Sequence, residues 1–251
     1  MFPDLIDIGF LHIKTYGAMM AIGFIACFWL IERLSGRKDL SNLLVSLLVS
    51  GVIGSRLAYV IEHWQTEFAA HPLNVVRVDQ GGLMFYGGLV LAAIVFFAWC
   101  RAKRESPLAL ADILACVLPL GHAFGRFGCF FYGCCYGRDS NAWCAVRFPV
   151  GSPSYFAHNA RVVGVLPTQL FEAVALLALF AALLSVRSRL AARRGAVFAL
   201  YCIGYAIIRF GIETMRGDPR ASVGELSIGQ AVSVGLLVLG GIVLGRAYHS
   251  R

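Results

Sequence analysis

Seven long apolar runs constrain this chain more than any other feature. Each is about 20 residues long, which is the length at which an α-helix crosses the hydrocarbon core of a bilayer. The chain is 59% hydrophobic and 14% charged, well outside the balance typical of a soluble domain. We therefore expect an all-α polytopic membrane protein, with residues 1–251 forming a single domain of seven transmembrane helices. The runs lie at roughly 15–34, 42–62, 83–101, 108–130, 168–186, 196–215 and 227–245.

Lysine and arginine predict how these helices are oriented. Twelve of the 22 lie in or beside one set of loops, and seven are spread over the longer loops of the opposite set. Cytoplasmic loops are enriched in these residues. We therefore predict an external N-terminus, an external loop at about 138–167 and a cytoplasmic C-terminus. This topology accounts for most of the net charge of +8, so we expect no nucleic-acid partner. The N-terminus lacks a basic region and a cleavage site, so we expect no removable signal peptide.

Three arginines remain inside predicted spans, where each costs a few kcal/mol and needs a partner. They share the outer depth with several glutamates, and Arg209 and Glu213 are spaced i, i+4, so they can pair on one helix face. These residues either tie helices together or snorkel to the interface, or they form a site for an anionic headgroup, since guanidinium matches phosphate bidentately. Their shared depth favours a phospholipid site. The residues are Arg56, Arg126, Arg209, Glu62, Glu172 and Glu213.

Glycines and tyrosines lie at the same predicted level. In QGGLMFYGGLV, residues 80–90, glycine pairs flank the start of the third span. Helix N-termini with exposed N–H groups favour anions, but small residues also let membrane helices pack closely, and for Gly87 and Gly88 alone packing is the simpler explanation. Tyr16 and Tyr86 lie where interfacial tyrosines are common.

The motifs resemble those of the prolipoprotein diacylglyceryl transferases. GRFGCFFYGCCYG at 125–137 is similar to the family signature glycine-arginine-x-glycine-asparagine-phenylalanine-x-asparagine-glycine-glutamate-x-x-glycine. Further matches cover nearly the whole chain in the family's order. They are TYGAMMAIGF in the first span, GSRLAYV at 54–60, GGLMFYGG at 81–88, LPTQLFE at 166–172, RFGIETMRGDP at 209–219 and LSIGQ at 226–230.

The resemblance implies a function and a set of site residues. Members move diacylglyceryl from phosphatidylglycerol to the lipobox cysteine thiol in a prolipoprotein signal peptide, at the periplasmic face of the bacterial inner membrane. The implied catalytic residues are Tyr16, Tyr86, His122, Arg126, Arg209 and Glu213. The implied substrate-binding residues are Arg56, Gly87, Gly88, Cys129, Gly137, Gln169, Glu172 and Arg216. We expect a monomer that contacts membrane lipid, with no cofactor and no metal site.

The chain departs from the family pattern at four positions. Cys129 and Tyr132 replace signature asparagines, Cys134 replaces the signature glutamate, and Tyr86 replaces a histidine. Because the predicted compartment is oxidising, we expect a disulfide from Cys134 or Cys135 to Cys144. A catalytic thiol, or a metal site with His122 or His158, are the other interpretations.

The implied reaction is substitution at the glycerol carbon that bears phosphate. Arg126 and Arg209 would stabilise the departing phosphate, Glu213 would orient Arg209, and Tyr16 would position the lipid or the acceptor. His122, one turn before Arg126, is a candidate base. The alternatives are a non-catalytic lipid or anion-binding protein or transporter, a related transferase with a different acceptor, and a membrane thiol oxidoreductase.

Overall fold

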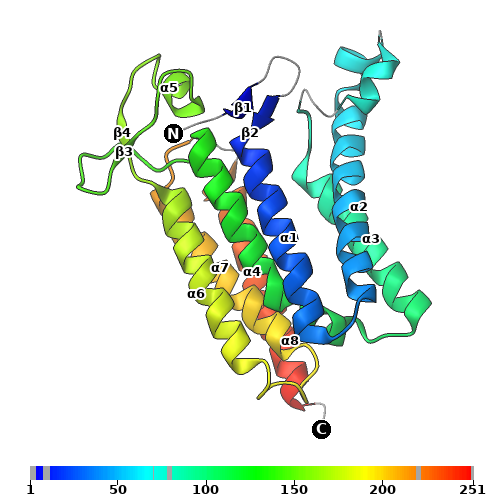
Figure 1. Ribbon diagram of the computed structural model, residues 1–251. Coiled ribbons are helices and arrows are strands. Elements are labelled where there is room, and N and C mark those ends of the chain that lie inside the picture. The colour runs from blue at the N-terminus through cyan, green and yellow to red at the C-terminus, as the bar shows by residue number, and fades with distance from the viewer. Residues whose placement is uncertain (1–3, 8–11, 70, 78–80, 219–221, 250–251) are drawn as a thin grey trace. The chain divides into compact units, whose positions relative to one another are not determined.

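The computed structural model of the chain describes residues 4–7, 12–69, 71–77, 81–218 and 222–249. Within these residues, seven helices are long and apolar enough to cross a membrane, which confirms the expected all-α polytopic architecture (Figure 1). Their starts and ends lie within four residues of the apolar runs. The helices are α1 (Thr15–Ser35), α2 (Asp39–Glu62), α3 (Phe85–Lys103), α4 (Pro107–Tyr132), α6 (Thr168–Val186), α7 (Ala196–Met215) and α8 (Ile228–His249).

The connections contain short elements. The predicted external loop holds a two-stranded antiparallel pair and the one-turn helix α5, which begins where the Ser152 hydroxyl accepts a hydrogen bond from the Tyr155 N–H at 3.2 Å. Two other antiparallel pairs precede α1 and α8. The short elements are β1 (Asp4–Asp7), β2 (His12–Lys14), a π-helix (Trp64–Phe68), a 3-10 helix (Pro72–Val76), β3 (Val146–Arg147), α5 (Pro153–Ala157), β4 (Gly164–Val165), β5 (Ser222–Val223) and β6 (Leu226–Ser227).

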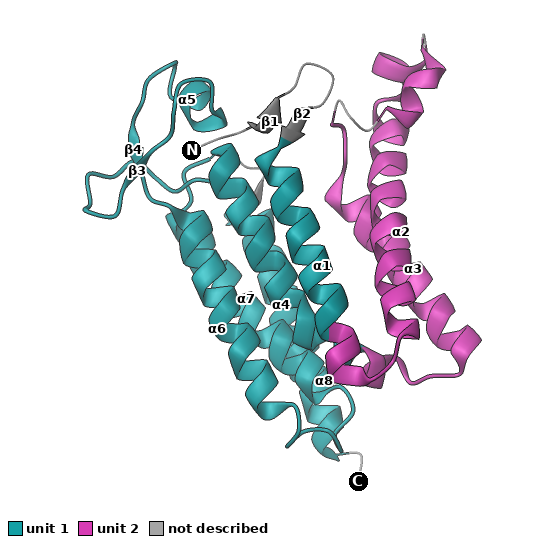
Figure 2. Cartoon of the chain, in the orientation of Figure 1, with its two compact units in different colours: residues 1–30, 111–251 teal, residues 31–110 magenta. Residues whose placement is uncertain are grey.

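The chain separates into two compact units, coloured in Figure 2: unit 1 contains residues 1–30 and 111–251, and unit 2 contains residues 31–110. In unit 2, α2 and α3 pack closely because glycines remove side chains from their contact. A Cβ on Gly54 would lie 2.5 Å from the Gly87 carbonyl oxygen, and one on Gly88 would lie 2.6 Å from the Gly51 carbonyl oxygen. Small residues at such contacts are what membrane helix pairs require.

In unit 1, the start of α7 is held by a residue of α4. The Asp112 carboxylate accepts hydrogen bonds from the backbone N–H groups of Gly195, at 2.6 Å, and Phe198, at 2.8 Å. These N–H groups have no partner within the helix, so an acidic residue satisfies them and complements the helix dipole. Further along α4, Ala123 forms a fully buried cluster with Ala173 and Leu176 of α6, and Tyr205 of α7 packs against it. This packing brings α4, α6 and α7 together at the candidate site.

Candidate active site

A buried carboxylate lies at the centre of the candidate site. Glu172, in the second turn of α6, is 1% exposed, and its two oxygens face arginines from two other helices. Its Oε1 lies 2.9 Å from Nη2 of Arg126 on α4, and its Oε2 lies 3.3 Å from Nη1 of Arg209 on α7. A carboxylate so deeply buried needs such partners to remain charged. Glu172 therefore fixes the two guanidinium groups relative to each other.

A second glutamate completes this arginine–glutamate network. Nη2 of Arg209 lies 2.9 Å from Oε2 of Glu213, which confirms the i, i+4 pair expected from the sequence. Two arginines and two glutamates give the network no net charge. The Glu213 carboxylate fits because α8 presents Gly229 to it: a Cβ there would lie 2.7 Å from its oxygen. The LSIGQ motif does not by itself indicate this role of Gly229.

Backbone hydrogen bonds hold the segment after α4 beside the arginine–glutamate network. The Gly137 N–H donates to the Leu166 carbonyl at 2.8 Å, and the Arg138 N–H donates to the Met215 carbonyl at 2.9 Å. A Cβ on Gly137 would lie 2.7 Å from the Leu166 Cβ. Glycine is therefore required here by close packing, which gives a physical reason for the last glycine of the signature-like stretch.

Two polar residues of α6 hold the same segment. The Thr168 hydroxyl donates to the Cys135 carbonyl at 2.9 Å, and the Gln169 amide donates to the Cys134 carbonyl at 2.6 Å. Gln169 is 1% exposed, and its Oε1 has no hydrogen-bond partner. An unpaired buried acceptor costs about 1–3 kcal/mol, so this oxygen is suited to a donor on a bound substrate.

Arg216 follows α7 and pairs with Asp218 two residues later. Its Nε and Nη2 donate to the Asp218 carboxylate at 2.9 and 2.8 Å, and its side chain is 3% exposed. Burial lowers the pKa of Arg216, but the hydrogen bonds that it donates to Asp218 outweigh burial, and the pKa is raised. The sequence interpretation assigned Arg216 to the substrate, and its close partner Asp218 was missed.

Two further expected residues lie on either side of Arg126 along the length of α4: Tyr16, which reaches α4 from α1, and His122, which belongs to α4. Tyr16, on α1, packs against Gly128, where a Cβ would lie 3.0 Å from its ring, and its side chain is 41% exposed. His122 is half-buried, with its ring centroid 5.3 Å from that of Tyr205. Arg126 is therefore flanked by an accessible tyrosine on one side and an aromatic-packed histidine on the other.

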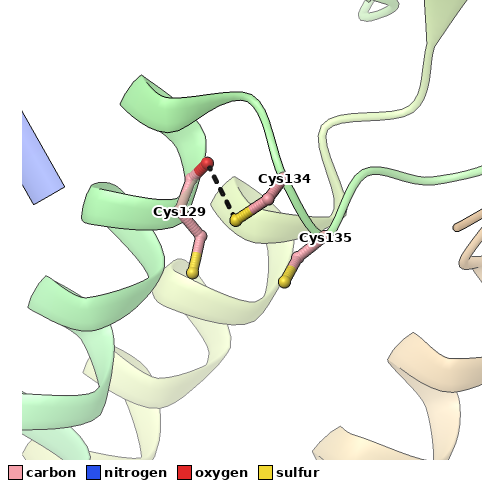
Figure 3. A group of neighbouring side chains, drawn as sticks. All are labelled: Cys129, Cys134 and Cys135. Atoms are coloured by element: carbon pink, nitrogen blue, oxygen red, sulfur yellow. Dashed lines mark hydrogen bonds between the residues drawn. The ribbon is translucent and has the colours of Figure 1, made fainter. Parts of the chain in front are cut away.

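The cysteines differ from the expected arrangement. All eight are free thiols, so the structure does not contain the disulfide from Cys134 or Cys135 to Cys144. Instead, the sulfur atoms of Cys129, Cys134 and Cys135 lie within 4.8 Å of one another (Figure 3). The sequence alone favoured Cys144 because the intervening loop is short, whereas a tight turn brings the two adjacent cysteines back to the end of α4.

Four of the expected site residues belong to unit 2 and are described within it. The Arg56 side chain donates to the carbonyls of Val75, Gly81, Gly82 and Asn74 at 2.6 to 3.1 Å, beside a small polar cavity of about 130 Å³. Arg56 thus satisfies backbone carbonyls of the α2–α3 connection. The other three are Tyr86, which is 48% exposed, and the packing glycines Gly87 and Gly88.

Comparison with known proteins decides the family. The family model described as "Prolipoprotein diacylglyceryl transferase" matches residues 3–246. The chain belongs to this family. Curated relatives named phosphatidylglycerol–prolipoprotein diacylglyceryl transferase include those of Clostridium tetani, 32% identical over 96% of this chain and 95% of its own, and Geobacter sulfurreducens, 32% identical over 95% and 92%. A relative of the same name from Photobacterium profundum is 31% identical over 99% and 94%.

Two departures from the transferase family signature now have a location. Cys129 and Cys134, which replace a signature asparagine and the signature glutamate, are two of the three clustered thiols, and Cys129 is three residues after Arg126 on α4. These two of the four departures therefore lie together at the end of the helix that carries Arg126. Cys135, the third thiol, adjoins them, and it was not among the expected site residues.

Proposed function

We propose that this chain transfers a diacylglyceryl group from phosphatidylglycerol to the lipobox cysteine thiol of prolipoproteins. The names of relatives that match over nearly the whole chain support this reaction. The observation that carries it is the arginine–glutamate network, in which Glu172 holds the guanidinium groups of Arg126 and Arg209 on one carboxylate. Such paired guanidinium groups suit a phosphate that gains charge as it leaves.

The two arginines supply the electrostatic part of the proposed mechanism. As the acceptor sulfur attacks the glycerol carbon, the carbon–oxygen bond breaks and glycerol phosphate departs with the electron pair. Arg126 and Arg209 stabilise that charge. Their side chains are 19% and 13% exposed, so both remain partly accessible to a substrate. Each guanidinium has five N–H donors, more than the glutamates engage. Glu172 and Glu213 act as positioning residues for them.

Of the remaining residues of unit 1, His122 is assigned to proton transfer and the others to positioning and binding the substrates. Tyr16 contributes an accessible ring beside the signature, and Gln169 offers its unpaired Oε1 to a donor on the substrate. Gly137 allows the segment after α4 to approach α6. Cys129 lies three residues after Arg126 on α4, and Arg216 pairs with Asp218 in the segment after α7. His122 is the base in the simplest version of the mechanism, since it lies one turn from Arg126.

In unit 2, the assignments rest more on the family resemblance. We place Tyr86, Gly87 and Gly88 in the reaction only through their match to the family's histidine-glycine-glycine segment. Arg56 instead stabilises the α2–α3 connection, because its donors already bond to four carbonyls. The lysine and arginine distribution supports a bacterial inner-membrane location with the site facing the periplasm. We expect the active form to be a monomer.

The test is a lipidation assay with purified chain, phosphatidylglycerol vesicles and a synthetic lipobox peptide. We expect the peptide to gain one diacylglyceryl group on its cysteine, detected by mass spectrometry, with one glycerol phosphate released per peptide. A peptide with serine in place of the cysteine is the matched control. Tight binding of phosphatidylglycerol without any transfer would contradict the proposal and favour a lipid-binding relative with altered chemistry.

A further inference from the structure

The three clustered thiols are arranged by the backbone itself. Cys129 lies in the last turn of α4, and Gly133 then adopts φ 81° and Cys135 adopts φ 62°. The Gly133 and Cys134 N–H groups both donate to the Cys129 carbonyl, at 2.9 and 3.2 Å. This turn reverses the chain, so that both later cysteines face the first (Figure 3). A non-glycine residue rarely adopts positive φ, so the conformation of Cys135 is imposed by its surroundings.

The surroundings that impose it are buried and polar. Thr168 and Gln169, each 1% exposed, hold the carbonyls of Cys135 and Cys134. The carbonyls of Cys134 and Cys135 are therefore fixed to α6. The half-buried sulfur atoms lie within 4.8 Å of one another, and the Cys134 thiol donates to the Cys129 carbonyl at 3.8 Å. Fixing ligand residues through a surrounding shell of hydrogen bonds is how proteins prepare metal sites.

Three thiols suit a metal ion better than a disulfide, because a disulfide would join two of them and leave the third thiol unused. Thiolates select soft ions such as Zn²⁺ and Cu⁺. A Zn–S bond of about 2.3 Å with tetrahedral angles puts sulfur atoms about 3.8 Å apart. The observed limit of 4.8 Å is within about 1 Å of that spacing, which side-chain rotation can close.

We propose that Cys129, Cys134 and Cys135 bind one Zn²⁺ and leave its fourth position open for the thiolate of the acceptor cysteine. Three protein ligands with one open position are typical of catalytic rather than structural zinc. Zinc with three thiolates carries one negative charge. The Arg216 guanidinium, which interacts with Cys135, provides a positive neighbour. The role of the open position rests on the proposed function.

The zinc ion would replace a general base. A thiol that coordinates a metal is deprotonated outright, so the acceptor would lose its proton to solvent when it binds. Its sulfur then forms a bond to the glycerol carbon, the bond from that carbon to the phosphate oxygen breaks, and glycerol phosphate leaves with the electron pair. No oxidant or reductant is needed. An acceptor thiol that binds zinc needs no histidine base. This explains why a chain with three clustered thiols can have Tyr86 at the position where the family has histidine.

Metal content is the first measurement. The full-length protein is purified in detergent, equilibrated with micromolar Zn²⁺ under reducing conditions, desalted and analysed by mass spectrometry for metals. We expect one zinc per chain in the wild type and in Cys144→Ser, a thiol of the same loop outside the cluster, but less than about a tenth of that in Cys129→Ser or Cys135→Ser. Wild-type protein without zinc, or with copper in its place, would overturn the assignment.

Binding of the acceptor cysteine at the open zinc position is measured on the wild-type protein, so the measurement does not depend on whether a variant folds. With Co²⁺ in place of zinc, the thiolate-to-cobalt absorption should change when the lipobox peptide is added, and should not change with its serine analogue. Removing the metal should lower transfer at least about tenfold, with recovery on adding Zn²⁺. Full transfer by metal-free protein would overturn the acceptor role and leave the proposed function intact. Stoichiometric zinc without any transfer would instead contradict the proposed function.

Discussion

Glu172 is the residue on which the geometry of the candidate site depends most. It is 1% exposed and has an arginine at each oxygen, so it holds α4, α6 and α7 at one point by charge. Its Oε1 contact with Arg126 is an ion pair without hydrogen-bond geometry. A phosphate oxygen with better alignment can therefore compete for that guanidinium.

Arg126→Lys tests the phosphate contact. Lysine keeps the charge but cannot reproduce the planar fork of two N–H donors, so we expect transfer to fall by about a hundredfold. The initial rate of peptide lipidation is the measurement, and Arg161→Lys, at an exposed position of the external loop, is the control. Wild-type rates in Arg126→Lys would show that the phosphate is held elsewhere.

Glu172→Gln tests the positioning role. Glutamine has nearly the same shape as glutamate but no charge, so two buried arginines lose a shared partner. We expect the free energy of unfolding to fall by about 3 kcal/mol. The apparent melting temperature in detergent should fall, together with the transfer rate. Glu225→Gln, at an exposed position before α8, should change neither. Unchanged stability in Glu172→Gln would mean that the network does not hold the helices together.

Among the elements, the spans were predictable and the contacts between them were not. Apolar length fixes where a helix can cross a bilayer, and i, i+4 spacing fixes the pairing of Arg209 with Glu213. The bridge through Glu172 depends on how α4, α6 and α7 pack, which periodicity does not encode. The thiol cluster depends on positive φ at Cys135, a conformation that the residue type does not signal.

Asp112 gives a test of one such contact between elements. Asp112→Ala removes the acceptor of two N–H groups at the start of α7, which we expect to destabilise the protein by about 1–2 kcal/mol. Amide hydrogen exchange at residues 195–199 should accelerate. Asp112→Asn keeps one acceptor oxygen and should have the smaller effect. Equal exchange in wild type and Asp112→Ala would contradict the capping role.

The external loop has a pH-sensitive contact. The His158 ring bonds to the Ser154 carbonyl at 2.6 Å and to the Asp139 carboxylate at 2.9 Å, and these bonds raise the pKa of His158. Protonated His158 therefore stabilises the folded loop fully at pH values below its unfolded-state pKa of about 6.5. This stabilisation is lost as the pH rises through the higher pKa of His158 in the folded state. Proteolysis of the loop should therefore be faster at pH 8 than at pH 5.5. Asp139→Asn should reduce this difference, and an unchanged difference would exclude the pair as its source.

At the scale of the whole molecule, the orientation in the membrane is the prediction on which the cellular role depends. Reporter fusions after residue 104 and at the C-terminus should be cytoplasmic, and a fusion within residues 138–167 should be external, because lysine and arginine favour the cytoplasmic side. The opposite pattern would place the arginine–glutamate network where periplasmic prolipoproteins cannot reach it.

The neutrality of the arginine–glutamate network has a consequence for turnover. In the proposed mechanism, a lipid phosphate that enters adds a negative charge to a site whose positive charges are already matched, so it competes with Glu172 and Glu213 for the guanidinium groups. Glycerol phosphate that has separated from the lipid is no longer anchored by acyl chains, whereas Glu172 remains beside both arginines and Glu213 beside Arg209. We expect the glutamates to recover their partners and expel the product, so that the enzyme resets without a large movement of its helices.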